Sequence, residues 1–231
     1  MKCKKNIIQD ESGEKIYLDE VDNSYIVEYK DELHLAGKRI IKLKELGQKF
    51  SSINSFFFDY LNAYNIPTGY KKQVDNLVYF QKHSRYPFTI NIYNVIDRRI
   101  SRLFGKKEGE NLSIPVFEFL YGTSKDNLIT ESHLISLDIC PIDDLKTMKR
   151  ICSKVNAVLK SYFERRNTFL AEIKCEFGKD EDKIFLVGSF TPKCLKVLPG
   201  ASELKSINPF RFKSPAEFKN YTEFISGLTK N

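Results

Sequence analysis

Seven basic side chains gather between residues 82 and 107, and together they could bind a phosphate group. They are Lys82, Arg85, Arg98, Arg99, Arg102, Lys106 and Lys107. Arg98 and Arg99 begin a helix predicted over residues 97–104, where the helix dipole opposes positive charge. Two adjacent arginines at such a point indicate an anion nearby, and a solvated basic helix face is the alternative. A patch of this size suits a phosphorylated small molecule as well as a polynucleotide.

Charged and apolar residues alternate over AEIKCEF, so Glu172, Lys174 and Glu176 would share one face of a strand. This alternation leaves more than one interpretation open. The three side chains form a functional polar site, or they form a structural charge cluster with neighbouring strands. Glu176 facing solvent beside Lys183 is a third interpretation. Cys175 lies on the opposite face and is expected in the core.

The histidines and cysteines lack the spacing of a metal site. His34, His83 and His133 are far apart in the sequence, and each is expected to be a surface or core residue. The five cysteines include no CxxC pair and are Cys3, Cys140, Cys152, Cys175 and Cys194. Neither a disulfide framework nor a zinc site follows, and a reduced, cytoplasmic setting is expected.

Hydrophobic periodicity predicts the elements that must position these residues. Strands are predicted over residues 15–19, 24–30, 75–82, 87–95 and 114–121, with a hairpin over 169–190. Helices are predicted over 50–65, 97–104 and 142–167, with a short final helix from Pro215. The pattern predicts an α+β chain with a β-rich N-terminal lobe, residues 1–84, and a mixed α/β C-terminal lobe, residues 85–231. The two lobes are expected to join near residues 83–87.

The composition of the 231-residue chain is that of a folded protein, and it narrows the classes of partner. Apolar residues make up 42% and charged residues 29%, which excludes global disorder. No apolar run approaches the about 20 residues of a membrane helix, and the first residues lack the apolar core of a secretory signal. The net charge is +7, but the basic excess is spread along the chain. That distribution argues against a nucleic-acid partner.

Several segments resemble, in order and spacing, the motifs of one enzyme family. IKCEFGKDEDKIFLVGSFTPKCLKVL (173–198) is similar to a segment that reads FKLEFG, a turn and LLxDExSPDxxRLW. VEYKDELHLAGKR (27–39) and YLNAYNIPTGY (60–70) resemble VEFKDDxTAxNGxK and YLxxxGIPTHF, and PFTINIYNVIDRRISRLFG, IPVFEF and DNLITESHL resemble further motifs. The family is SAICAR synthetase (phosphoribosylaminoimidazole-succinocarboxamide synthase), and the resemblance spans residues 7–215.

The resemblance implies a two-lobed fold, similar in outline to a protein kinase, with ATP bound in a cleft between the lobes. It also implies a ligation in which ATP and Mg²⁺ phosphorylate a substrate carboxylate, and the amine of aspartate then displaces phosphate. The implied catalytic residues are Lys174 and Glu176, and Glu176 is also the implied metal ligand. The implied nucleotide-binding residues are Lys15, Lys82 and Glu131. The implied substrate or anion ligands are Asn94, Arg98, Arg99, Lys196 and Arg211.

Two departures from the family motifs concern the metal and the nucleotide. Gly188 and Ser189 replace the acidic pair of the second hairpin strand, so Glu176 is the remaining metal-site carboxylate. In the nucleotide loop, Glu11 and Glu14 stand where the family has glycine and lysine. Because added carboxylates oppose a triphosphate, we expect weak nucleotide binding with little Mg²⁺ dependence.

A further departure concerns the substrate, and it leaves three interpretations open. Tyr93, Arg98 and Arg99 replace the arginine and the Gly-Ser of the family's substrate loop. This favours a divergent ATP-dependent carboxylate–amine ligase that acts on a different phosphorylated small molecule, with an amino acid as co-substrate. Loss of the acidic pair favours a catalytically inactive member that binds a nucleotide, a phosphorylated ligand or a protein partner. The ordinary purine-pathway enzyme is the third interpretation. No membrane partner is expected, and a homo-oligomer is left open.

Overall fold

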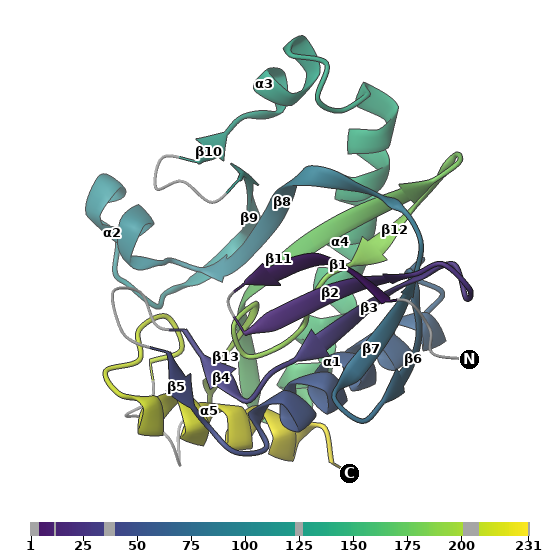
Figure 1. Cartoon of the computed structure of the whole chain (residues 1–231). Helices are drawn as coiled ribbons and strands as arrows, with labels where there is room; N and C mark the ends of the chain where they lie inside the picture. Colours follow the sequence, from purple (N-terminus) through teal and green to yellow (C-terminus); the bar gives the residue numbers. More distant parts are fainter. Residues whose placement is uncertain (1–4, 12, 35–39, 123–126, 201–207, 231) are drawn as a thin grey trace.

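The computed structural model describes residues 5–11, 13–34, 40–122, 127–200 and 208–230. Two antiparallel sheets and the helices packed against them make up most of this part of the chain (Figure 1). The first sheet has the order β1-β2-β3-β7-β6, with β1 Lys5–Glu11, β2 Glu14–Asp19, β3 Ser24–Tyr29, β7 Leu77–Gln81 and β6 Tyr70–Val74. A separate short pair joins β4 (Glu32–Leu33) to β5 (Ile41–Lys42). The predicted strands at 15–19, 24–30 and 75–82 are confirmed, while β1 and β6 were absent from the sequence prediction.

Helix α1 (Leu46–Ala63) packs on the first sheet through apolar residues that recur every three or four positions. Its buried side chains include Phe50, Ile53, Phe57 and Leu61. The helix begins before the predicted start at residue 50. Asp31 accepts hydrogen bonds from the backbone N–H groups of Glu45 (3.1 Å) and Gly47 (2.9 Å). A side chain from outside the helix therefore caps its first turn.

The second sheet contains the predicted hairpin at one end. Its order is β10-β9-β8-β11-β12, with β13 paired to the other part of β11. The bounds are β8 Ser84–Val95, β9 Asn111–Tyr121, β10 Leu128–Ile129, β11 Thr168–Asp180, β12 Lys183–Val187 and β13 Leu195–Pro199. The turn between β11 and β12 is short, because the pairing continues to Asp180 opposite Lys183. Glu181 in this turn has a φ of 51°.

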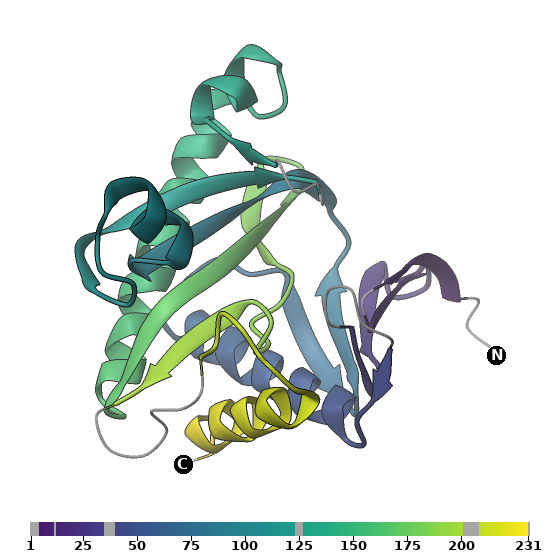
Figure 2. The ribbon, with the colours of Figure 1, turned by 90° about the vertical axis from the view of Figure 1, so that its left-hand side faces the viewer.

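Helix α4 (Ile142–Glu164) covers one face of the second sheet (Figure 2). Leu145, Met148, Val155 and Leu159 form part of its buried stripe, as the 3.6-residue period predicts. From the sheet, Ile90, Ile92, Ile173, Cys175 and Phe177 are buried. Because side chains alternate along a strand, the other face of β8 and β11 carries the residues in between, which are mostly polar. That polar face is the one available for a site.

Three smaller helices complete the described chain. Helix α2 (Arg98–Phe104) is capped by the Asp97 side chain, which accepts from the Ile100 N–H (2.7 Å), and it ends at Gly105 with a φ of 63°. The helix thus ends at the predicted residue 104, and a glycine with positive φ is a common residue after a helix end. Helix α3 (Glu131–Ser136) is too short for a periodic signal and was not predicted. Helix α5 (Pro215–Leu228) confirms the predicted final helix. No helix among the described residues is both long and apolar enough to cross a membrane.

Contacts between distant parts of the sequence join the two sheets. Backbone hydrogen bonds link Gly69 to the Leu186 carbonyl (2.8 Å) and Leu186 to the Pro67 carbonyl (3.0 Å). Helix α5, from the end of the chain, packs against α1, with the rings of Phe50 and Phe218 6.0 Å apart. Residues from both sheets belong to one continuous core. The division into lobes at residues 84 and 85 stays a prediction.

Candidate functional site

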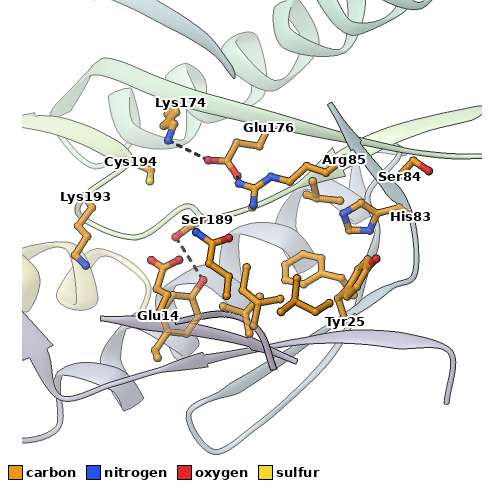
Figure 3. A pocket seen from close by; sticks show the side chains of 18 residues that line it. Glu14, Tyr25, His83, Ser84, Arg85, Lys174, Glu176, Ser189, Lys193 and Cys194 are labelled. Atoms are coloured by element: carbon orange, nitrogen blue, oxygen red, sulfur yellow. Dashed lines mark hydrogen bonds and ion pairs between the residues drawn. The ribbon is translucent and has the colours of Figure 1, made fainter. Parts of the chain in front are cut away.

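A cavity of about 690 Å³ lies between the two sheets (Figure 3). Strands β1, β2, β3 and β7 line it from the first sheet, and β8, β11 and the end of β12 line it from the second. Its apolar part includes Ile16, Val27, Phe80 and Val187. Its polar part includes Glu14, Arg85, Lys174, Glu176 and Lys193. An apolar wall with a few charged groups at one end is typical of a small-molecule site.

Glu176 lies at the polar end of the cavity and is held by two cations. The Arg85 guanidinium bonds one carboxylate oxygen, and the Lys174 ammonium lies 3.0 Å from the other. The Glu176 side chain is 9% exposed. Burial by itself would raise the pKa of Glu176, but the positive charges of Arg85 and Lys174 outweigh it and hold this pKa below its usual value. Glu176 is therefore an ionised carboxylate in a buried network.

Because Gly188 has no side chain, the Glu176 carboxylate can occupy the space beside it. Gly188 has a φ of 90°, and a Cβ built there would lie 2.6 Å from Oε2 of Glu176. An aspartate at position 188 would need this carboxylate to move. The neighbouring Ser189 is buried, and its hydroxyl donates to Thr191 (2.9 Å) and accepts from the Tyr29 hydroxyl (3.4 Å). The serine thus serves a buried hydrogen-bond network.

The side chains present do not fit the Mg²⁺ ion that the family resemblance implies. Magnesium is usually held by about one or two carboxylates together with substrate phosphates. Both oxygens of Glu176 already pair with cations, and the residue after its cross-strand partner Val187 is a glycine. Within the described ranges, no group of three or more His, Cys, Asp and Glu residues could hold a metal ion.

Glu14 is the second carboxylate of the cavity. Burial raises its pKa, the nearby Glu176 raises it further, and Lys193, Lys174 and Arg85 oppose the rise. The two carboxylates therefore share one electrostatic environment across the cavity. The family resemblance singled out Glu14 as a change in the nucleotide loop. It gave no reason to expect this carboxylate near Glu176, because the two belong to different sheets.

The polar face continues beyond the cavity along β8, β11 and β13. Glu172 lies opposite Tyr93 in the β8–β11 pairing and opposite Lys196 in the β11–β13 pairing. Asn91 donates to Glu172 (3.1 Å) and to the Tyr93 hydroxyl (3.3 Å). The Oδ1 atom of Asn91 is buried without a hydrogen-bond partner among the described residues. Alternation predicted the shared face, whereas Asn91 was not a predicted site residue.

Glu172 is a carboxyl group on this face whose pKa is shifted toward neutrality. Burial and the nearby charges of Asp97 and Glu118 raise the pKa of Glu172, Lys196 and Lys174 oppose the rise, and the resulting pKa is about 7. A carboxyl group with a pKa near neutrality can both take up and release a proton. Burial lowers the pKa of Lys196, whose ammonium donates to the Pro192 carbonyl (3.1 Å).

The residues predicted to bind nucleotide do not all reach the cavity. Lys15 lies between the lining residues Glu14 and Ile16, so it belongs to the other face of β2, and its Nζ is 3.9 Å from Asp10. Lys82 is exposed and lies outside the lining. Glu131 lies on α3 and pairs with Lys149 (2.6 Å). The structure thus gives Lys15 and Glu131 other partners, and it does not bring the three together.

The residues predicted to bind substrate are also divided. Asn94 is buried and exchanges hydrogen bonds with Asn156 of α4 (2.7 and 2.9 Å), so it faces the helix and not the polar face. Arg99 pairs with Glu118, and Arg98 is exposed on α2. Arg211 is exposed before Phe212, whose ring lies 5.8 Å from the Lys196 ammonium. Among the site residues that the family resemblance implied, Lys174 and Glu176 line the cavity.

Comparison with known proteins gives one consistent result. The family profile described as SAICAR synthetase matches residues 13–206. The phosphoribosylaminoimidazole-succinocarboxamide synthase of Caldanaerobacter subterraneus subsp. tengcongensis is 30% identical over 193 residues, which are 82% of each chain. The crystal structure of the synthase from Ehrlichia chaffeensis has a TM-score of 0.85 at 20% identity, and the match covers 96% of this chain and 98% of that one.

A third match is to a ligand complex. A SAICAR synthetase solved in complex with ADP has a TM-score of 0.83 at 25% identity, covering 96% of this chain and 98% of that one. The structural matches show the fold that the motifs predicted, and the profile and the 30% relative show the family. This chain belongs to the SAICAR synthetase family.

Proposed function

We propose that this chain is an ATP-dependent ligase that joins an amine to a carboxylate, with a phosphorylated substrate different from that of the named relatives. The observation that carries the proposal is the continuous polar face of β8, β11 and β13. It leads from Lys174 and Glu176 in the cavity to Glu172 and Lys196 outside it. Membership of a family with a member solved in complex with ADP supports a nucleotide in the cavity.

Residues of this face suit the two halves of such a reaction. ATP transfers its terminal phosphoryl group to the substrate carboxylate and leaves as ADP. The amine then attacks the acyl phosphate, phosphate leaves, and the amine loses a proton. Lys174 supplies positive charge for the phosphates, and Glu172, with a pKa near 7, takes the proton that the amine releases.

The change of substrate is proposed from Tyr93. A phenol carries no positive charge, so an anionic substrate group paired with an arginine at this position would lose an ion pair here. Tyr93 is 7% exposed and lies beside Glu172 and Asn91. A neutral hydrogen-bonding group of the acceptor suits this position better than a phosphate.

The test is ADP formation in the presence of ATP, Mg²⁺, an amino acid and a panel of phosphorylated carboxylic acids. Supporting results are ADP release that requires both acceptor and amine, with the new amide identified by mass spectrometry. The variant Lys174→Met should abolish it, and the exposed-site variant Lys160→Met serves as the matched control. SAICAR formation at the rate of the named relatives would contradict an altered substrate.

A second candidate is a non-catalytic family member that binds a phosphorylated ligand. It is favoured by Glu176, whose two oxygens are both neutralised by Arg85 and Lys174. Binding of ADP in calorimetry, without amide formation for any acceptor of the panel, would select this candidate. Amide formation would exclude it.

A further inference from the structure

The ion pairs of Glu176 make Arg85 the cation nearest to the carboxylate where the family resemblance places a metal. Arg85 lies at the start of β8, and its guanidinium reaches Glu176 on the neighbouring strand β11 (Figure 3). Lys174 takes the other oxygen at 3.0 Å. A metal ion would have to displace one of these charge-assisted contacts before it could bind.

The space around Glu176 is also closed to a second carboxylate. A Cβ at position 188 would lie 2.6 Å from Oε2 of Glu176 and 2.9 Å from its Cβ and Cδ. The glycine at position 188 therefore leaves room for the Glu176 carboxylate in the position where it pairs with Arg85. An acidic residue at position 188 is incompatible with Glu176 as it is placed.

The charges that line the cavity favour an anion over a cation. Three basic side chains, Arg85, Lys174 and Lys193, line it together with two carboxylates, Glu14 and Glu176. A divalent cation would add to the excess positive charge, whereas a phosphate would reduce it. The Arg85 side chain is 47% exposed. Its guanidinium carries five N–H donors, more than the contact with Glu176 uses.

We propose that Arg85 supplies the positive charge beside Glu176 in this cavity. A phosphorylated ligand binds there to Arg85 without a divalent metal ion. The inference takes one point from the proposed function, which is that a phosphorylated ligand binds in the cavity. It assigns Arg85, which the family motifs do not single out, as a ligand-binding residue. The two sources of such a phosphate, a nucleotide or a smaller phosphate compound, are separated by the probes below.

The test is titration calorimetry of ADP and of inorganic pyrophosphate, each in Mg²⁺ buffer and in EDTA. For the unmodified chain, we expect the affinity for at least one probe to change by less than about twofold between the two buffers. Arg85→Gln should weaken that affinity by about tenfold or more, because it removes a charge-assisted contact to the phosphate. Arg85→Lys should restore most of it, since lysine keeps the charge.

Arg150→Gln is the matched control, because Arg150 is exposed on α4 and lies outside the cavity lining. It should bind like the unmodified chain. Thermal unfolding of each variant shows whether a loss of binding comes from a loss of folding. If Arg85→Gln does not fold, the affinity of Arg85→Lys tests the inference instead. Binding of the unmodified chain only in Mg²⁺ buffer would overturn the inference and leave the proposed ligase standing. Equal binding by Arg85→Gln in EDTA would overturn it as well.

The two probes keep the inference and the proposed function apart. If pyrophosphate binds in EDTA and ADP binds in neither buffer, the proposed nucleotide is wrong and the role of Arg85 stands. If neither probe binds in either buffer, both proposals are wrong.

Discussion

Replacing Gly188 with alanine should destabilise the protein more than the same change at Gly105. Both glycines have positive φ, 90° at Gly188 and 63° at Gly105. A Cβ at Gly105 meets nothing within 4 Å, whereas a Cβ at Gly188 meets the Glu176 carboxylate at 2.6 Å. The comparison therefore separates backbone strain, present at both positions, from the contact with Glu176, present at one.

The expected magnitudes follow from these two costs. A side chain in the left-handed region costs about 1–2 kcal/mol, and this is the whole effect expected for Gly105→Ala. At Gly188 the Glu176 carboxylate must also shift away from Arg85 inside a buried site. Weakening a buried charged hydrogen bond costs about 1–3 kcal/mol more. We expect Gly188→Ala to lower the free energy of unfolding by about 2–5 kcal/mol.

Urea denaturation of the two variants measures the difference, with the slope of the transition used to check that unfolding stays two-state. In a Glu176→Ala background the cost of Gly188→Ala should fall, because the nearest atom of position 176 is absent. Equal costs for Gly188→Ala and Gly105→Ala would refute the reasoning. So would a Gly188→Ala cost that does not change when Glu176 is replaced.

The pKa of Glu172 is raised to about 7, so the folded state keeps this proton to a higher pH than the unfolded state does. The free energy of unfolding should therefore fall as the pH rises from about 4.5 to about 7, by an amount on the order of 1–3 kcal/mol. Urea denaturation across this range should show the fall in the unmodified chain and a smaller one in Glu172→Gln, and an equal fall would contradict the assignment. Asn94→Ala should cost about 1–3 kcal/mol because it leaves the buried Asn156 amide unpaired, and Asn94→Ala with Asn156→Ala should cost less than the sum of the single changes in the same assay. Phosphate should raise the unfolding temperature, and Arg98→Ala with Arg99→Ala should reduce this protection because it removes two basic side chains of α2; unchanged protection in thermal unfolding would remove both from the site.

Local patterns were sufficient for the long elements of the fold. The apolar period of α4 and the alternation in β2, β3 and the β11–β12 hairpin depend on neighbours in the sequence. The start of α1 was mispredicted because Asp31, outside the helix, caps it. Strands β10 and β13 and helix α3 are too short to carry a period of their own. The two strands form because β10 pairs with β9 and β13 pairs with β11, and these partners lie elsewhere in the chain.

The same limit applies to the predicted site. Motif spacing selected Lys174 and Glu176, and both line the cavity. It also selected Asn94, which faces α4 because strand alternation turns it away from the polar face. Lys15 is turned away from the cavity on β2 for the same reason.

The sequence by itself determined which charges this protein carries and which it lacks, including a glycine at position 188 and an arginine at position 85. Only the tertiary structure decided that these two residues meet at Glu176. Arg85 and Glu176 are 91 residues apart in the chain. The pairing of β8 with β11 brings them together. Such a contact depends on the register between distant strands, and register depends on the packing of the whole sheet.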